Sequence, residues 1–238
     1  MKILAVETTA TAASCCLTDD GRVLGRFAVN AGLTHSRTLL PMIEQLLGGC
    51  GVQPADIDLY AVAAGPGSFT GVRIGVAAVK GLALPGNTPC MGVSTLAAMA
   101  RLWDGVPMTA TVCAAMDARC QQVYTALFAV KNGVVSRLTP DEAISLDELK
   151  DKLVAVDGPV VLMGDGAAVC AKAFTDLPNV TVAPAHLRMQ DAVGVAAEAA
   201  VCAERGETVA AAELLPVYLR VPQAERELKA RLAAEQNS

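Results

Sequence analysis

The sequence predicts an α/β protein built from two related lobes. Three strand-like segments occur within residues 2–29, and helix-like and strand-like segments then alternate as far as residue 103. The same order restarts near residue 109, with three strand-like segments followed by a second series of alternating helices and strands. Because this alternation is typical of layered α/β architectures, we expect two lobes that share one internal plan.

The first half is expected to begin with a hairpin, which is followed by a helix and then by alternating strands and helices. Asp19-Asp20-Gly21 supplies the turn chemistry of the hairpin. Gly48-Gly49 is expected to end the first helix, because glycine readily adopts the left-handed backbone that closes a helix. The expected strands are residues 2–7, 13–17, 22–29, 59–64 and 90–93, and the expected helices are residues 34–47, 72–84 and 94–103.

The second half repeats this order after a short hinge. Gly and Pro punctuate residues 103–107, so we divide the chain into a lobe of residues 1–104 and a lobe of residues 105–238 that ends in a helix and a tail. The sequence leaves open whether the last helix folds back over the first lobe. The expected strands are residues 109–116, 123–130, 134–138, 160–163 and 180–182, and the expected helices are residues 146–154, a segment after Gly166, and residues 191–204.

The composition indicates a dense core made of small side chains. Hydrophobic residues make up 53% of the chain and aromatic residues only 3%. The eight cysteines are scattered and no secretion signal precedes them, so we expect reduced thiols and a cytoplasmic protein. No run of eighteen uncharged apolar residues occurs, which argues against a membrane span. The net charge of −5, with no window rich in Lys or Arg, argues against a chain that grips RNA by itself.

The most informative segment is the glycine-rich run from Gly65 to Gly75, which follows an apolar strand and opens a helix. Its turn could hold a phosphate at a helix N-terminus, but it matches neither a Walker loop nor a dinucleotide fingerprint. The alternative is a tight turn that feeds a closely packed helix, and the spacing favours this interpretation. One face of that helix would carry Gly71, Gly75, Ala78 and Leu82.

The complete run resembles the signature of the TsaB (YeaZ) family, the dimerisation subunit of the bacterial machinery that makes threonylcarbamoyladenosine in tRNA. The resemblance extends along most of the chain, although Glu7 stands where an Asp is usual and the tail after Val221 has no counterpart. It implies an actin-like ATPase fold with a degenerate nucleotide site. The further matching motifs are Met1-Lys2-Ile3-Leu4-Ala5-Val6-Glu7-Thr8-Thr9, His35-Ser36 with Leu39-Leu40-Pro41, Gly92-Val93-Ser94-Thr95-Leu96, Asp117-Ala118-Arg119 with Val123-Tyr124, and Pro216-Val217-Tyr218-Leu219-Arg220.

The two loops that hold phosphates in active members of that fold are poorly represented. The first corresponds to Glu7-Thr8-Thr9, which has no glycine to let the backbone approach a phosphate. The second corresponds to Gly164-Asp165-Gly166, which alone is half of a clamp. We favour a structural role for both loops, because a carboxylate without converging partners is ordinary. We therefore expect no catalytic residue and no cofactor.

A metal site is not expected either. The catalytic paralogue, TsaD, carries a His-x-x-x-His pair on a helix, and such spacing places two imidazoles on one face. Here Leu39 stands four residues after His35, and no histidine lies four residues from His186. The chain thus resembles the paralogue that kept the fold and lost the chemistry.

Two helices are more apolar than a single lobe requires, and in the resembled family they pair with a partner as a four-helix bundle. The alternative is that both helices simply cover their own sheet. A helix that is apolar on nearly all sides needs a second surface, which favours the interface. The interface residues that we expect are His35, Leu39, Met42, Ile43 and Leu46 on the first helix, and Gly71, Ile74, Gly75, Ala78 and Leu82 on the second.

Two functions are therefore compared. The first, implied by the resemblance, is a non-catalytic scaffold that dimerises with TsaD and, through that complex, works with the ATPase TsaE, touching tRNA only indirectly. A homodimer of the free chain is left open. The alternative is a stand-alone ATPase or small-molecule kinase of the actin-like fold, which would use the Glu7 and Asp165 loops.

Overall fold

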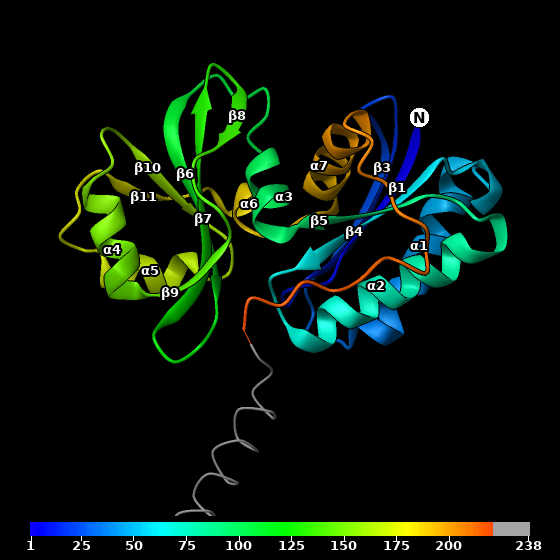
Figure 1. Cartoon of the computed structure of the whole chain (residues 1–238), viewed down its shortest axis with the longest axis horizontal. Helices are drawn as coiled ribbons and strands as arrows, with labels where there is room; N and C mark the ends of the chain where they lie inside the picture. Colours follow the sequence, from blue (N-terminus) through cyan, green and yellow to red (C-terminus); the bar gives the residue numbers. More distant parts are fainter. Residues whose placement is uncertain (221–238) are drawn as a thin grey trace, which may run out of the picture.

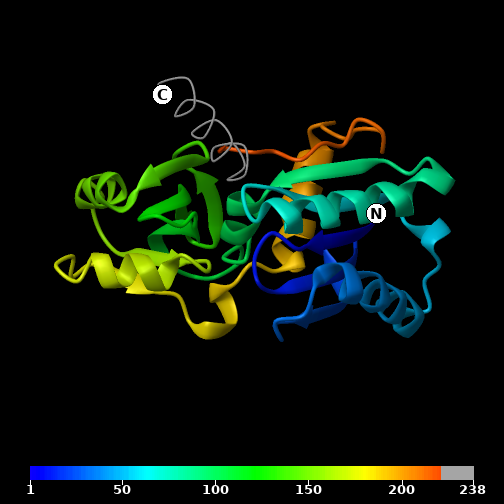
Figure 2. The same ribbon diagram turned by 90° about the horizontal axis from the view of Figure 1, so that it is seen from below.

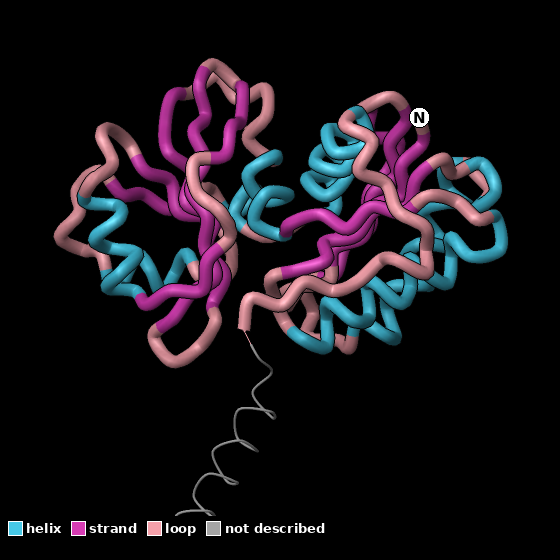
Figure 3. The backbone as a smooth tube through the Cα atoms, in the orientation of Figure 1, coloured by secondary structure: helices cyan, strands magenta, loops and turns pink. Residues whose placement is uncertain are grey.

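The computed structural model describes residues 1–220, and the tail after Val221 lies outside the described residues. It has two lobes, each built around one β-sheet (Figure 1). In Figure 3 the strands of the two sheets form two separate groups, and helices lie against each of them. Seen at right angles in Figure 2, the lobes lie side by side. The predicted two-lobed α/β architecture is thus confirmed.

The first sheet has the strand order β3-β2-β1-β4-β5. β1 pairs antiparallel with β2 and parallel with β4, so the hairpin precedes a parallel edge. Every residue of β4 is buried, as expected for a strand with both faces covered. The strands are β1 (Lys2–Glu7), β2 (Ala13–Asp19), β3 (Arg22–Val29), β4 (Leu59–Gly65) and β5 (Cys90–Ser94).

Helices cover both faces of this sheet. Helices α1 (His35–Cys50) and α2 (Phe69–Ala83) share one hydrophobic core with Leu4, Val6 and Val62. On the opposite face, helix α7 (Ala192–Glu204) packs on Ile3, Ala5 and their neighbours. Short 3₁₀ turns, η1 (Pro54–Asp56) and η2 (Leu84–Gly86), flank β4 and α2. The last described helix of the second half thus folds back over the first lobe, a point that the division near residue 105 left open.

The second sheet has the order β11-β10-β6-β7-β8, and β9 also pairs with β7. Helices α4 and α5 share a core with one face of this sheet, and α3 shares a core with other residues of β6 and β7. The strands are β6 (Thr109–Asp117), β7 (Gln122–Lys131), β8 (Val134–Arg137), β9 (Glu142–Ser145), β10 (Val160–Met163) and β11 (Val180–Val182), and the helices are α3 (Thr95–Arg101), α4 (Leu146–Val154), α5 (Ala167–Ala173) and α6 (Ala185–Arg188).

Three local predictions differ from the structure. Helix α1 runs through Gly48-Gly49 to Cys50, because Gly51, with φ of 65°, supplies the left-handed cap instead. Helix α2 begins at Phe69, because the Ser68 side chain caps it. Strand β9 and helix α6, each four residues long, were not predicted, since such short segments carry no readable period.

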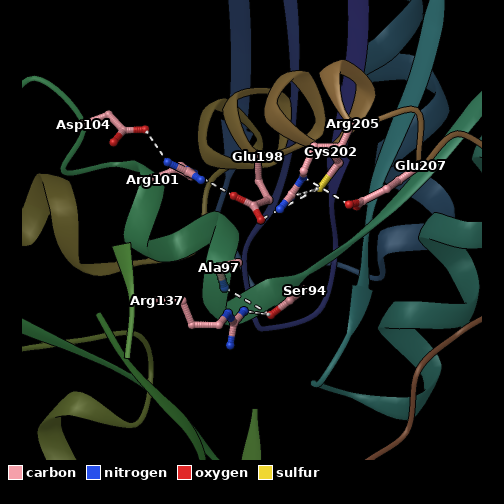
Figure 4. A network of polar contacts seen from close by, with 9 residues as sticks. All are labelled: Ser94, Ala97, Arg101, Asp104, Arg137, Glu198, Cys202, Arg205 and Glu207. Atoms are coloured by element: carbon pink, nitrogen blue, oxygen red, sulfur yellow. Dashed lines mark hydrogen bonds and ion pairs between the residues drawn. The ribbon is translucent and has the colours of Figure 1, made fainter. Parts of the chain in front are cut away.

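Polar contacts join α3 to α7, and join the start of α3 to Arg137 of the second lobe (Figure 4). The Arg101 guanidinium on α3 donates to the Glu198 carboxylate on α7 over 2.6 Å. At the start of α3, the Ser94 hydroxyl donates to Asp141 Oδ2 over 2.5 Å, and Arg137 donates to Asp141 Oδ1 over 2.6 Å. Asp141 and Arg137 belong to the second lobe, so this cluster links the two lobes.

Within residues 1–220, no helix combines the length and the apolar character that crossing a bilayer requires.

The close contact between α3 and α7 leads to a first prediction. A Cβ added at Gly194 would overlap the carbonyl of Ala98, so we expect Gly194→Ala to lower the free energy of unfolding by roughly 1–3 kcal/mol. Urea denaturation measures this. The matched control is Gly49→Ala on α1, where an added Cβ meets nothing and the change should be neutral or stabilising. Equal stability of the two variants would contradict the close contact.

Candidate functional site

The glycine-rich signature packs against the loop that follows β1. The Ser68 backbone N–H donates to the Thr9 carbonyl over 2.7 Å, and the Thr8 hydroxyl donates to the Gly71 carbonyl over 2.8 Å. A Cβ at Gly71 would overlap the Thr8 carbonyl, and a Cβ at Gly75 would lie 2.5 Å from the Thr8 hydroxyl. The glycines therefore allow α2 to approach this loop closely. This agrees with the interpretation of the signature as a tight turn that feeds a closely packed helix.

Glu7 ends β1 beneath this contact and is buried, with 1% of its surface exposed. One of its carboxylate oxygens accepts the Thr9 backbone N–H over 2.5 Å. Burial raises the pKa of Glu7 to about 7, against the opposing effect of the hydrogen bonds from Thr9 and with further help from the charge of Asp165. Glu7, Thr8 and Thr9 thus use most of their polar groups within the lobe.

The second expected phosphate loop, Gly164-Asp165-Gly166, also makes its hydrogen bonds within the protein. The Gly164 N–H donates to the Arg188 carbonyl over 2.6 Å, and the Gly166 N–H donates to the Ala115 carbonyl over 3.1 Å. The Gln190 side-chain amide donates to Asp165 Oδ1 over 2.8 Å. Burial is the largest cause of the raised pKa of Asp165. The two glycine amides that could face a phosphate are therefore already bonded to backbone carbonyls.

The two loops do meet at one cavity between the lobes. This cavity has a volume of about 600 Å³, and its lining residues include Thr9, Ser68, Asp117, Arg119, Asp165 and Tyr218. Both carboxylates and guanidinium groups line it, so its polarity is mixed. The structure therefore brings Thr9 and Asp165 to one cavity, whereas Glu7 lies buried behind the first loop.

The structure corrects part of the expected interface. Leu39, Met42, Ile43 and Leu46 are each at most 6% exposed and lie in the core of the first lobe. The reason is that the apolar stripe of α1 faces its own sheet, and of these four side chains only Ile43 also lines the groove described below. The His35 ring lies 2.8 Å from the Ala10 carbonyl through Nε2, which ties the start of α1 to the loop after β1.

The five expected interface residues on α2 fall into two groups. Gly71 and Gly75 face the loop after β1 and are buried, so they too point inward. Ile74, Ala78 and Leu82 are partly buried and sit on the edge of α2, where they pack against the core.

Between the two helices lies an apolar groove. Its volume is about 560 Å³, and its lining is mainly apolar with one charged side chain. The lining residues are Leu40, Pro41, Ile43, Glu44, Leu47, Gly48, Val52, Gln53, Pro54 and Leu82. Leu40 is 51% exposed at its rim. The exposed positions Ala77 and Gly81 on α2 were missed by the sequence analysis, and their spacing from Thr70 and Ile74 is the helical signal that could have identified them.

Both charged side chains of α2 point away from this groove. Lys80 Nζ donates to the carbonyls of Ala212 and Leu214 over 3.1 and 3.2 Å. Arg73 Nε donates to the Tyr218 hydroxyl over 2.9 Å. These bonds hold both charged groups against the segment after α7, although Arg73 itself is exposed.

Most of this chain is similar in sequence to known proteins. A family model described as "TsaD: tRNA N6-adenosine threonylcarbamoyltransferase" matches residues 29–229. The tRNA threonylcarbamoyladenosine biosynthesis protein TsaB of Bacillus subtilis (strain 168) is 32% identical over 235 residues, which cover 94% of this chain and 96% of the relative.

Solved structures share the fold. YeaZ from Pseudomonas aeruginosa superposes with a TM-score of 0.77 at 30% identity, covering 92% of this chain and 99% of that one. The activator of the 2-hydroxyisocaproyl-CoA dehydratase from Clostridium difficile is 14% identical, with a TM-score of 0.50 over 87% of this chain and 97% of that one. The fold is the two-lobed actin-like ATPase fold.

Burial of Glu7 leads to a prediction on pH dependence. The folded pKa of about 7 lies above the value of about 4.3 expected for an unfolded chain. The stability that Glu7 contributes is therefore full below about pH 4.3 and is lost as the pH rises through 7. Glu7→Gln keeps an acceptor for the Thr9 amide but cannot ionise. We expect it to gain up to roughly 3 kcal/mol over the wild type between pH 5 and pH 8, measured by urea denaturation. Parallel pH profiles for the two proteins would contradict this.

Proposed function

The chain belongs to the TsaB family of tRNA threonylcarbamoyladenosine biosynthesis proteins, and from this membership we propose that it acts as a non-catalytic subunit of that pathway. The resemblance expected from the sequence motifs is thus confirmed. We further propose that it dimerises with the catalytic paralogue TsaD and supports transfer of threonylcarbamoyl to N6 of the adenosine next to the anticodon. We also propose that it works with the ATPase TsaE through that complex, and that the free chain can form a homodimer.

The observation that carries the docking proposal is the largely apolar groove between α1 and α2, with small exposed residues of α2 near it. Ala77 and Gly81 are exposed on α2, Ile74 and Leu82 are partly exposed, and the lining of the groove is mainly apolar, with Glu44 and Gln53 as its polar members. Small residues let a second helix approach closely, and burial of the flanking aliphatic groups contributes about 25 cal/mol per Å² of apolar area. A helix pair from a protein of the same fold suits this face, because contacts between like surfaces are common in symmetric and pseudo-symmetric dimers.

Support for a non-catalytic role comes from the two loops beside the cavity. The Thr9 amide is bonded to Glu7, and the Gly164 and Gly166 amides are bonded to backbone carbonyls. A nucleotide phosphate would have to replace these bonds. The net charge of −5 further supports contact with tRNA through the partner rather than directly, and we place the complex in the cytoplasm.

The docking face is tested by a charge placed at its centre. We expect Ala77→Arg to weaken binding to TsaD at least tenfold and to remove any self-association, because the partner helix would bury an unpaired guanidinium. Light scattering and titration calorimetry measure both effects. The matched control is Ala168→Arg, since Ala168 is also exposed on a helix but lies in the second lobe. Both variants should keep the wild-type melting temperature, and wild-type affinity of Ala77→Arg would place the interface elsewhere.

The non-catalytic role is tested at the second loop. We expect Asp165→Asn to retain full tRNA threonylcarbamoylation in the reconstituted complex, because Asp165 accepts a structural hydrogen bond from Gln190 and its amide replacement stays folded. Mass spectrometry of the tRNA nucleosides measures the product. A variant that folds and binds its partner but gives less than a tenth of the modified nucleoside would support the alternative of an enzyme in its own right.

A further inference from the structure

The segment after α7 forms a strap, residues 211–220, that runs beside α2 and ends between the lobes. In Figure 1 it is the orange to red trace that leaves α7, follows α2 and reaches the space beside β7. Ala211 and Leu214 are buried in the core of the first lobe. The Val217 N–H donates to the Ala64 carbonyl at the end of β4 over 2.7 Å. The strap is therefore an integral part of the first lobe up to Val217.

Tyr218 attaches the strap to the first turns of α2. Its ring packs on Phe69, with the ring centroids 4.9 Å apart and the planes inclined by 32°. The Arg73 guanidinium lies 3.9 Å from the centre of the Phe69 ring and also donates to the Tyr218 hydroxyl. Such stacked aromatic and cation–π contacts are favourable at partly exposed sites. The position of Tyr218 therefore depends directly on the position of α2.

Two residues further on, the strap crosses to the second lobe. Arg220 Nη1 donates to the Ala118 carbonyl over 2.8 Å, and Ala118 begins the loop between β6 and β7. Tyr218, Leu219 and Arg220 line the cavity between the lobes together with Ala118 and Arg119. The strap therefore forms one wall of that cavity.

The loop that Arg220 contacts has an unusual backbone. Arg119, Cys120 and Gln121 are consecutive non-glycine residues with φ of 61°, 54° and 58°. Left-handed backbone costs about 1 kcal/mol or more per such residue and persists where surrounding contacts fix it. The contacts here include Asp117 accepting the Arg119 amide over 2.7 Å and the bond from Arg220. A loop held in this way is sensitive to the loss of one contact.

We propose that Tyr218 and Arg220 form a latch that links α2 to the β6–β7 loop, so that docking at α2 orders this loop in the wall of the cavity between the lobes. The proposal rests on the proposed function in one respect, that α2 docks a partner. A partner that fixes α2 fixes Phe69 and Arg73, which hold Tyr218, and Arg220 then holds the loop of the other lobe. By linkage, whatever orders that loop also favours docking.

Hydrogen exchange of the full chain tests the latch. The reporters are the amides of Ala118, Arg119 and Gln122, which are hydrogen-bonded within the loop. We expect Tyr218→Ala, whose contacts named above lie in the first lobe, to speed exchange of these amides about tenfold, and Arg220→Ala to do the same. The matched control is Leu215→Ala, because Leu215 lies on the same strap and is 68% exposed. It should leave the loop unchanged. Unchanged loop exchange in Tyr218→Ala, with or without faster exchange in α2, overturns the latch.

Adding TsaD separates this proposal from the docking proposal. In the wild type we expect the partner to slow exchange of the loop amides, while in Tyr218→Ala it should bind α2 without protecting the loop. Light scattering establishes binding in each sample. If TsaD does not bind the wild type, the docking proposal fails and the free-chain comparison still decides the latch. If it binds and protects the loop equally in both proteins, the latch is overturned and the docking face stands.

Discussion

The arrangement of the first lobe depends on the close approach of α2 to the loop after β1. This approach requires hydrogen in place of a side chain at Gly71 and Gly75, because the Thr8 carbonyl and hydroxyl occupy the space that a Cβ would need. With the helix held there, the Thr8 hydroxyl bonds Gly71 and the Thr9 carbonyl accepts the Ser68 amide. The same contact therefore fixes the orientation of α2 and engages the Thr8 hydroxyl, while the Thr9 amide is bonded separately to Glu7.

The sequence was sufficient for the fold class and the family, because these depend on features that are local in the chain. Strand β4 is a continuous apolar run between turn residues, and α1 has its apolar residues at helical spacing, so both could be placed before the structure was known. The signature was also correctly interpreted as a turn that feeds a packed helix. What local patterns do not fix is the end of a helix: Gly48-Gly49 was expected to stop α1, but the left-handed residue is Gly51.

The candidate interface was harder to predict for a physical reason. A row of glycines favours close packing equally well against a partner helix and against a loop of the same lobe, and the sequence cannot distinguish the two. In the structure Gly71 and Gly75 use their small size inside the lobe, and the apolar stripe of α1 covers its own sheet. The outward face is instead made by residues such as Ala77 and Gly81, which sequence analysis passed over because small side chains carry little hydropathy signal.

The strap, residues 211–220, makes contacts between residues that are far apart in the sequence, and such contacts could not be predicted from local patterns. Arg73 and Tyr218 are 145 positions apart, so no window along the chain could pair them. Their contact adds to the Ser94–Asp141–Arg137 cluster and the Arg101–Glu198 pair, which hold α3, α7 and the second lobe in fixed positions. A docking surface needs a rigid α2, since each side chain that is ordered only on binding reduces affinity. Under the docking proposal, the Arg73–Tyr218 contact would serve recognition by fixing α2 before a partner binds.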